Sequence, residues 1–460
     1  MKKCKFFVAF LMGKLSLVAI KILSRFVKKE GTTLPGNIVL KICPEFLKYI
    51  GKPSRMIAVT GTNGKTTTNN MIADVLSMNG YKVLSNRAGG NIAAGIATCL
   101  LRGVDLLNRS RYDVAALEID ERSSKRIYPY VQPDFIVCSN LSRDSCKRNA
   151  HPQYIFDFID QNLPDRSVLI LNADDLISSR LKKENARVYY AIDRQESDKT
   201  EPFNIINDVR ICPNCQEKLV FDYVRYNHIG HAHCPNCGLE SPKPDFHVTS
   251  IDETAKQITV SEKGEMQTYP LVFDSIFNIY NEISAITALR SFGLGHKQIA
   301  DALKKVSVVG SRFSQDEVKG IRIISTMTKG WIAPSCSVAF DFVANFPGEK
   351  EIVVMIEDTD DNIQSSENLC YIYDTDFEFL NKPDIRHITV CGIRAKDYLL
   401  RMLLAGIPRE KISCVREIPE IAGTLTVEKG VDFHIIYDLH QMEAFHQIRN
   451  LVIEKIKQEG

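Results

Sequence analysis

The sequence predicts an α/β protein in which a parallel sheet carries a small cysteine-rich insertion and is followed by a second α/β domain. Three observations predict this fold. Short apolar strands alternate with helical patterns from Met56 onward. A glycine-rich loop joins the first of these strands to a helix. Two Cys-x-x-Cys pairs interrupt the alternation at a spacing typical of a zinc site.

Length and composition limit the possibilities further. A chain of 460 residues is too long for one core, so two or three domains are expected. Hydrophobic residues make up 44% of the chain and no internal repeat is evident, which indicates an ordered globular protein. A net charge of +2, with 25% charged residues, argues against a surface that binds nucleic acid.

Residues 1–50 are expected to form an N-terminal helical segment. Its apolar run from Phe6 to Met12 is followed by Lys14, so the run falls short of the ~20 residues needed to span a bilayer. An amphipathic helix with basic residues along it is the preferred interpretation. These residues are Lys3, Lys5, Lys14, Lys21, Arg25, Lys28 and Lys29. We expect the helix to pack on the next domain, with contact to a membrane surface as the alternative.

The central domain is expected to span residues 51–308. Met56 to Thr60 forms its first buried strand, and apolar residues recur at helical spacing from Met71 to Met78. Further strands are expected at Val83–Ser85, Val114–Ile119, Phe135–Ser139, Val168–Leu171 and Val188–Ile192. A helix from Phe273 to Phe292 closes the domain.

The loop between the first strand and its helix is predicted to bind a polyphosphate. Gly61 and Gly64 let backbone N–H groups approach phosphate, and the helix N-terminus adds partial positive charge. Lys65 can reach the terminal phosphates, and Thr66 can hold Mg²⁺. The pattern G-x-x-x-x-G-K-[ST] requires glycine at position 59, where this chain has Val59. A glycine turn with a solvent-exposed lysine is the alternative.

The cysteine pairs predict a zinc ribbon inserted at residues 209–246. Its ligands are Cys212, Cys215, Cys234 and Cys237, in two Cys-Pro-Asn-Cys motifs separated by eighteen residues. Four thiolates leave no open coordination position, so the zinc is expected to be structural. Disulfides are the alternative, although thirteen cysteines beside a nucleotide site favour a reducing compartment. Nearby histidines that could replace a cysteine are His228, His231 and His233, but a place outside the ligand set is preferred.

A second α/β domain is expected over residues 309–460. The boundary falls at about Val309–Arg312. New strands are expected at Ile321–Ser325, Ile352–Ile356 and Ile388–Cys391, with a helix over Lys396–Leu404.

The loop Gly61-Thr62-Asn63-Gly64-Lys65-Thr66-Thr67 resembles the ATP-binding loop of the Mur ligase superfamily, which joins carboxylates to amines through acyl phosphates. The resemblance implies that these seven residues bind the nucleotide, and that Thr66 and Glu118 hold magnesium. Glu118 ends an apolar strand, and Asn278 matches the family's asparagine near the adenine. Each of these two residues alone is more often a solvated strand end or a helix cap.

Further segments narrow the resemblance to the family of MurT-type ligase subunits of lipid II isoglutaminyl synthase. They are Gly31–Gly36, Asn140–Asp144, Leu171–Asp175, Asp374–Glu378 and Gly392–Asp397. The resemblance implies ATP-dependent amidation of the α-carboxylate of D-glutamate in the lipid II stem peptide, giving D-isoglutamine. It also implies that ammonia comes from a GatD-type glutaminase partner. The sequence agrees in one respect, because no Gly-x-Cys-x-Gly nucleophile elbow surrounds any cysteine.

In that family the ligase subunit lends the glutaminase an aspartate that orients a catalytic histidine. The best match is Asp361, with Asp358 and Asp360 as alternatives. An aspartate against imidazole fixes its tautomer and stabilises the imidazolium. The chain departs from the family's pattern just after this point, at Ser365-Ser366 and at Cys370–Tyr373. A solvated acidic loop is the alternative interpretation.

The expected function is therefore that of an ATP-dependent carbon–nitrogen ligase subunit. Lys65, Glu118 and Asp361 are its candidate catalytic residues, and ATP, Mg²⁺ and Zn²⁺ its expected cofactors. An amino-acid-adding Mur or folylpolyglutamate-type ligase is the first alternative, and a nucleotide-binding interaction module without amide-forming activity is the second. We expect a cytoplasmic protein, with attachment at the inner face of the membrane as an alternative location.

Overall fold

The computed structural model describes residues 2–23, 33–87, 90–143, 151–273, 275–306, 313–330, 332–356 and 369–460. Its described residues form two compact units. The first contains those up to Arg143, those from His151 to Pro202 and those from Asp208 to Val306. The second contains those from Phe203 to Asn207 and those from Phe313 onward.

A nine-stranded sheet forms the centre of the first unit, in the order β11-β10-β9-β6-β5-β4-β1-β3-β2. The strands are β1 (Arg55–Thr60), β2 (Val83–Ser85), β3 (Val114–Glu118), β4 (Phe135–Cys138), β5 (Val168–Asn172), β6 (Arg187–Ile192), β9 (Phe246–Asp252), β10 (Gln257–Glu262) and β11 (Glu265–Pro270). The seven strands from β9 to β2 pair in parallel, which confirms the predicted parallel α/β sheet. Because β1 lies between β3 and β4, the loops that follow these three strands meet at one edge.

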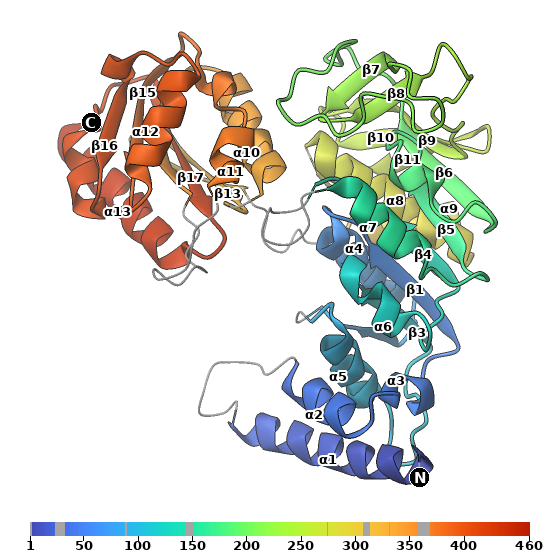
Figure 1. The fold of residues 1–460 in the computed structure, drawn as a ribbon. Helices are drawn as coiled ribbons and strands as arrows, with labels where there is room; N and C mark the ends of the chain where they lie inside the picture. The colour runs from blue at the N-terminus through green and yellow to red at the C-terminus, as the bar shows by residue number, and fades with distance from the viewer. Residues whose placement is uncertain are drawn as a thin grey trace. The chain divides into compact units, whose positions relative to one another are not determined.

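Helices cover both faces of this sheet (Figure 1). On one face lie α4 (Lys65–Met78), α8 (Ile276–Phe292) and α9 (His296–Leu303). On the other lie α5 (Ala93–Gly103), α6 (Ser124–Ile127) and α7 (Pro152–Asp160). Side chains along β1 alternate between the two faces of the sheet and so contribute to both hydrophobic cores. Ile57 and Val59 face α4 and α8, while Ala58 faces the opposite layer. Strands buried on both faces explain the near-continuous apolar runs in the sequence.

Two antiparallel strands extend the sheet, and sequence reasoning did not predict them. β10 pairs antiparallel with both β9 and β11. The turn between β10 and β11 contains Lys263 and Gly264, both at positive φ, of 50° and 98°. Such a two-residue turn matches the twist of a hairpin. The polar composition of β11 hides its strand character, because much of that strand is exposed.

The first unit begins with α1 (Lys2–Leu23), α2 (Leu34–Ile42) and α3 (Phe46–Tyr49). α1 packs on α2 and α5 and buries Ala9 and Phe10, which confirms the expected packing on the following domain. The expected shortness of its apolar run was wrong. Lys3–Leu23 is one helix of 21 residues, long and apolar enough to cross a membrane by length and composition alone. Lys14 does not interrupt it, because its Nζ donates to the backbone carbonyls of Leu101 and Val104 at 2.8 and 2.7 Å.

The second unit is built on a six-stranded sheet in the order β12-β13-β17-β14-β15-β16. The strands are β12 (Phe313–Val318), β13 (Ile321–Thr328), β14 (Glu349–Met355), β15 (Ile385–Cys391), β16 (Ile412–Val415) and β17 (Val431–Asp438). All neighbours except β12 and β13 pair in parallel. The helices α10 (Ala333–Asn345), α11 (Cys370–Asp374) and α12 (Ala395–Leu404) cover one face, and α13 (Met442–Glu459) covers the other. The expected second α/β domain is confirmed in its elements.

The segment Phe203–Asn207 belongs to the second unit although it lies far from it in sequence. Asp376 binds it twice, accepting from the Asn204 side chain at 2.9 Å and from the Ile205 N–H at 2.6 Å. Ile206 is buried in the core that α10, α11 and α12 cover.

Candidate active site

The phosphate loop runs from the end of β1 at Thr60 to the start of α4 at Lys65. Its two glycines have positive φ, 120° at Gly61 and 84° at Gly64. A Cβ at Gly61 would lie 2.4 Å from the Ser139 Oγ, and one at Gly64 would lie 2.0 Å from the Asn281 Oδ1. Both positions therefore require glycine, for conformation and for space.

The segment after β4 braces this loop. The Asn140 backbone carbonyl accepts from the Thr62 N–H at 2.8 Å, and the Asn140 side chain accepts from the Asn63 N–H at 3.3 Å. Thr62 Oγ1 accepts from the Ser142 N–H at 3.0 Å, and Ser139 Oγ donates to the Asn63 carbonyl. The sequence marked 140–144 only as a matching segment. In the structure, Asn140 and Ser142 of this segment brace the loop through these hydrogen bonds.

Lys65 forms a buried ion pair beside the loop. Its Nζ donates to Glu121 Oε1 at 2.6 Å and also to the Gly61 carbonyl. Burial opposes a charge on Lys65, but the Glu121 carboxylate outweighs this effect and raises the pKa of Lys65. The ammonium is thus held charged at the edge where a polyphosphate would lie. Sequence reasoning gave no role to Glu121, which begins the short helix η1 (Glu121–Ser123) just after β3.

Glu118 and Thr66 lie together at the same edge. Thr66 Oγ1 donates to Glu118 Oε2 at 2.8 Å, and Asn91 Nδ2 donates to Glu118 Oε1 at 2.9 Å. The Asn86 side chain holds the backbone of Glu118 through two further hydrogen bonds. A carboxylate and a hydroxyl facing one another are oxygen ligands of the type that Mg²⁺ takes next to substrate phosphates. The pair predicted for magnesium is therefore brought together, and the donor set fits that ion.

Asn278 lies in the first turn of α8. Asn281 Nδ2 donates to Asn278 Oδ1 at 3.0 Å, and Asn281 itself packs on Gly64. The neighbouring Phe277 ring lies 4.1 Å, centroid to centroid, from the Tyr226 ring of the insertion. The structure therefore places Asn278 within one helical turn of a residue that contacts the loop, and an aromatic pair beside it.

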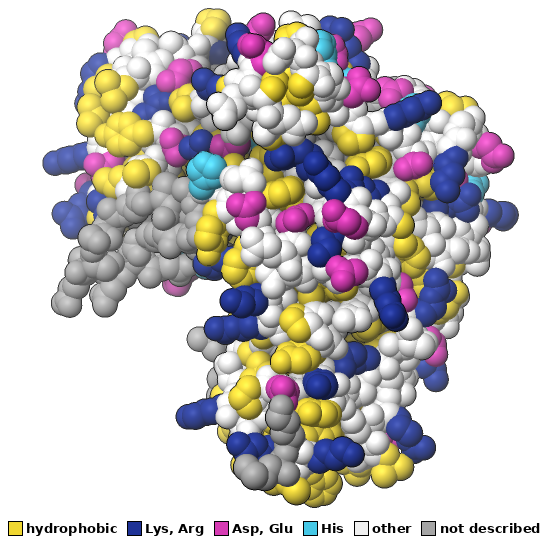
Figure 2. All heavy atoms as spheres, turned by 45° about the vertical axis from the view of Figure 1, so that its right-hand side comes forward, with side chains coloured by type: hydrophobic (Ala, Val, Ile, Leu, Met, Phe, Trp, Pro, Cys, Tyr) yellow, Lys and Arg dark blue, Asp and Glu magenta, His cyan; other side chains and the backbone are white. Residues whose placement is uncertain are grey.

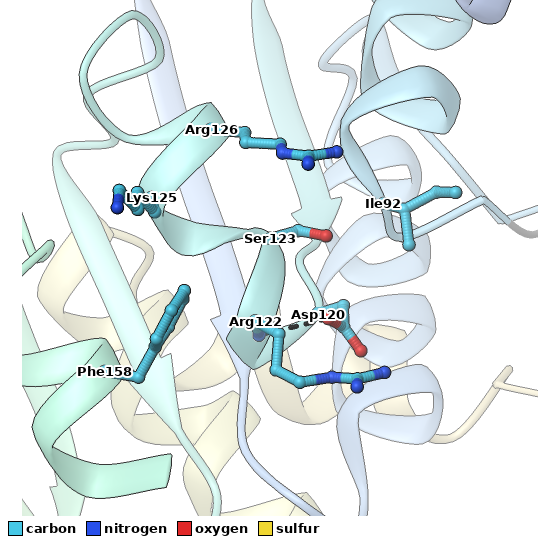
Figure 3. Close-up of a pocket in the computed structure, with 7 residues that line it drawn as sticks. All are labelled: Ile92, Asp120, Arg122, Ser123, Lys125, Arg126 and Phe158. Carbon is cyan, nitrogen blue, oxygen red and sulfur yellow. Dashed lines mark hydrogen bonds between the residues drawn. The ribbon is translucent and has the colours of Figure 1, made fainter. Parts of the chain in front are cut away.

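A pocket of about 280 Å³ opens at the residues that follow β3 in the chain (Figure 3). Its lining residues are Ile92, Asp120, Arg122, Ser123, Lys125, Arg126 and Phe158. In Figure 3 the guanidinium groups of Arg122 and Arg126 and the Ser123 hydroxyl point toward the side of Ile92. Three basic side chains and one acidic one make the lining suitable for an anion.

The four predicted cysteine ligands come together at the tip of the insertion. The Sγ atoms of Cys212 and Cys237 are 3.5 Å apart, and those of Cys215 and Cys234 are 3.4 Å apart. All four lie within 4.8 Å of one another. A tetrahedral zinc with bonds of about 2.3 Å sets its sulfurs about 3.8 Å apart, so the donor set can hold such an ion. All four are free thiols in this structure.

The three histidines of the insertion have carboxylate partners. His228 binds Asp175 at 3.1 Å, and His231 and His233 both bind Asp222, at 2.7 and 3.2 Å. Burial disfavours a charge on His228, but Asp175 outweighs this effect and raises its pKa. None of the three belongs to the cysteine cluster.

Two aspartates after β5 tie the insertion to the rest of the unit. Asp174 accepts from the Tyr223 hydroxyl at 2.9 Å and pairs with Arg225, both on β7 (Val220–Tyr226). Asp175 accepts from the Leu141 N–H at 2.8 Å and thereby contacts the segment that braces the loop. The insertion's hairpin, β7 with β8 (Ile229–His233), is thus anchored beside the candidate site.

The remaining predicted site residue, Asp361, lies outside the described residues, as do Asp358 and Asp360.

Comparison with known proteins gives the family. The Mur ligase middle domain family matches residues 59–289, and the MurT ligase C-terminal family matches residues 334–442. The lipid II isoglutaminyl synthase (glutamine-hydrolyzing) subunit MurT of Staphylococcus aureus strain COL is 31% identical over 387 residues, covering 84% of this chain and 85% of that one. The chain belongs to the MurT family. The MurT subunit of Streptococcus pneumoniae R6 is 27% identical and covers 91% of this chain and 92% of its own.

Solved structures show that the MurT-family chain has the Mur ligase fold. A pseudomurein peptide ligase type C from Methanothermus fervidus superposes with a TM-score of 0.65 at 20% identity, covering 90% of this chain and 84% of that one. MurF from Acinetobacter baumannii superposes with a TM-score of 0.60 at 15% identity, covering 88% and 76%.

Lys65→Ala is expected to lower ATP turnover by on the order of 10²–10³-fold, because it removes a preorganised charge from the phosphate site. The variant also leaves Glu121 buried without its partner, which by itself can destabilise the fold. We therefore pair it with Lys65→Ala/Glu121→Gln, which removes that carboxylate charge as well. Lys304→Ala, an exposed lysine of the same unit, is the control. The measurement is the steady-state rate of phosphate release from ATP. A wild-type rate in the folded double variant would show that Lys65 has no role in the reaction.

Proposed function

We propose that the chain is the ligase subunit of a lipid II amidating enzyme. It would activate the α-carboxylate of D-glutamate in the lipid II stem peptide with ATP and amidate the acyl phosphate with ammonia. One observation carries this proposal. The ion pair of Lys65 and the Thr66–Glu118 pair lie at the edge of one sheet, beside a basic pocket, in a chain whose relatives are named lipid II isoglutaminyl synthase subunits.

For this reaction the protein mainly has to position ATP and the acceptor carboxylate and to stabilise the negative charge on the phosphates. The reaction is an in-line attack of a carboxylate oxygen on the γ-phosphorus of ATP, with ADP as the leaving group. Lys65 would neutralise charge on the β- and γ-phosphates, and Glu121 keeps that ammonium charged and in place. Thr66 and Glu118 would hold magnesium, which supplies a further positive charge at the phosphates. Ammonia then attacks the acyl phosphate, releases phosphate and leaves the amide.

The basic pocket suits the acceptor end of this reaction. A stem peptide carries carboxylates, and lipid II carries a pyrophosphate, so the acceptor is anionic. Arg122, Ser123 and Arg126 offer donors on one side of the pocket, within eight residues of Glu118, the proposed magnesium ligand.

Ammonia is proposed to come from a GatD-type glutaminase partner. The environment of Cys138 supports this proposal. Cys138 is buried, and burial raises the pKa of its thiol well above the usual value, so the thiolate nucleophile that glutamine hydrolysis needs is disfavoured.

The test is an amidation assay with purified chain, lipid II and ATP. We expect amide product with ammonium salts and the chain alone, and with glutamine only when the glutaminase subunit is added. Incorporation of an amino acid in place of ammonia would favour an amino-acid-adding ligase. ATP binding without any amide product would favour an interaction module.

A further inference from the structure

One face of α1 is apolar and points away from the core of the first unit. Its large side chains there are Phe7, Val8, Leu11, Met12, Leu15, Val18, Ile22 and Leu23, and they are 44% to 63% exposed. They recur at intervals of three and four residues, so they form one stripe along the helix. We call these eight residues the outer stripe. A continuous apolar stripe on the surface of a protein marks an interaction surface.

The opposite face of α1 is fixed to the first unit. A Cβ at Gly13 would lie 2.6 Å from a Val39 methyl carbon and 2.7 Å from one of Leu101, so α2 and α5 approach the helix closely there. Phe6 adds a ring contact with Phe46 at 5.3 Å. The Lys14 ammonium binds two backbone carbonyls at the same level. A helix held at Phe6, Gly13 and Lys14 in this way would lose all of these contacts if it crossed a bilayer, so it is built to lie flat.

The charge around the outer stripe has one sign. Residues 1–55 contain twelve lysines and arginines but only two acidic residues, Glu30 and Glu45, although the whole chain has a net charge of only +2. Lys3, Lys5 and Lys21 are exposed on α1 itself, which has no acidic residue. Figure 2 shows hydrophobic and basic side chains together at the lower end, where this segment lies. A bilayer with anionic lipids has an apolar interior beneath a layer of negatively charged headgroups. An apolar stripe bordered by lysines complements both parts of such a surface.

We propose that the outer stripe of α1 docks in the plane of an anionic lipid bilayer, with its apolar side chains at the acyl boundary and its lysines among the headgroups. The proposal stands independently of the reaction proposed above, because it rests on the surface of α1 alone.

The test is flotation of the full chain with phosphatidylglycerol vesicles and, separately, with phosphatidylcholine vesicles. We expect binding to phosphatidylglycerol that high salt weakens. Leu11→Gln/Leu15→Gln/Val18→Gln is expected to weaken it by on the order of 100-fold or more, because apolar area no longer leaves water. Lys3→Gln/Lys5→Gln/Lys21→Gln is expected to weaken it by on the order of 100-fold. The matched control is Leu106→Gln/Leu107→Gln, two side chains 79% and 70% exposed in the same unit.

The variants are first compared with wild type by thermal unfolding and ATP turnover, so that binding is read only on folded protein. Equal flotation of wild type and the stripe variant would overturn the proposal. So would resistance to carbonate extraction, which indicates a spanning helix. Concentration-dependent self-association of wild type without lipid, abolished in the stripe variant, would assign the stripe to a second copy instead and would also overturn it.

Discussion

Cys212→Ser is expected to abolish binding of one zinc ion per chain and to unfold the tip of the insertion. Cys212 is buried, and its Sγ lies with three other thiols within 4.8 Å. Structural zinc contributes on the order of 10–16 kcal/mol in small zinc-binding folds, far more than the few apolar side chains near the two Cys-Pro-Asn-Cys motifs can supply. Metal analysis of protein purified without chelator, with limited proteolysis of residues 209–246, measures both effects.

The β7–β8 hairpin has its own contacts with the rest of the unit, so the loss of structure in Cys212→Ser should stay confined to the cysteine motifs. Arg225 pairs with Asp198 at 2.6 Å, and Tyr223 binds Asp174 at 2.9 Å, both in the buried part of the unit. We therefore expect nucleotide binding to persist in Cys212→Ser, with Cys4→Ser, an exposed cysteine of α1, as the control. Protein that contains no zinc before any substitution, yet keeps a protease-resistant insertion, would refute the metal site.

The parts of the site that the sequence predicts are those fixed by local chemistry. A polyphosphate loop needs glycine at Gly61 and Gly64 whatever surrounds it, and the positive φ angles there confirm the reason. Four thiolates on one ion need two tight turns, so the Cys-x-x-Cys spacing of the two pairs is enough to predict the metal site. Glu118 is predicted from the resemblance to the Mur ligase superfamily, whose magnesium-binding glutamate it matches.

The contacts that sequence reasoning missed depend on how distant segments meet. Glu121 becomes the partner of Lys65 only because η1 turns back toward the loop after β3. Asn91 reaches Glu118 from a different loop. Lys14 resembled an interruption of an apolar run, but backbone carbonyls of α5 and its following residue satisfy its charge. The pattern of apolar and polar residues within one segment does not indicate which side chains of other segments it will contact.

Asp361→Asn is expected to lower glutamine-dependent amidation about 10⁴-fold while leaving ammonia-dependent amidation unchanged. The reason is chemical. If Asp361 orients the catalytic histidine of a bound glutaminase, an amide in its place leaves that imidazole in the wrong tautomer, a loss of about 10⁴ in kcat in a known triad. Free ammonia bypasses this step, because Lys65 and Glu118 are proposed to act on ATP and the acceptor and not on glutamine.

Asp358→Asn and Asp360→Asn are the matched controls, since each removes the same charge from the same acidic stretch. Only one of the three variants should lose the glutamine-dependent reaction, because a single carboxylate can bind the imidazole nitrogen in question. If Asp358→Asn or Asp360→Asn is the defective one, the role moves to that residue. If the three variants all match wild type with glutamine, the acidic stretch does not serve a glutaminase. Loss of both reactions in Asp361→Asn would instead assign this aspartate to the ligase site, because no defect confined to glutamine hydrolysis can block an enzyme that is supplied with ammonia.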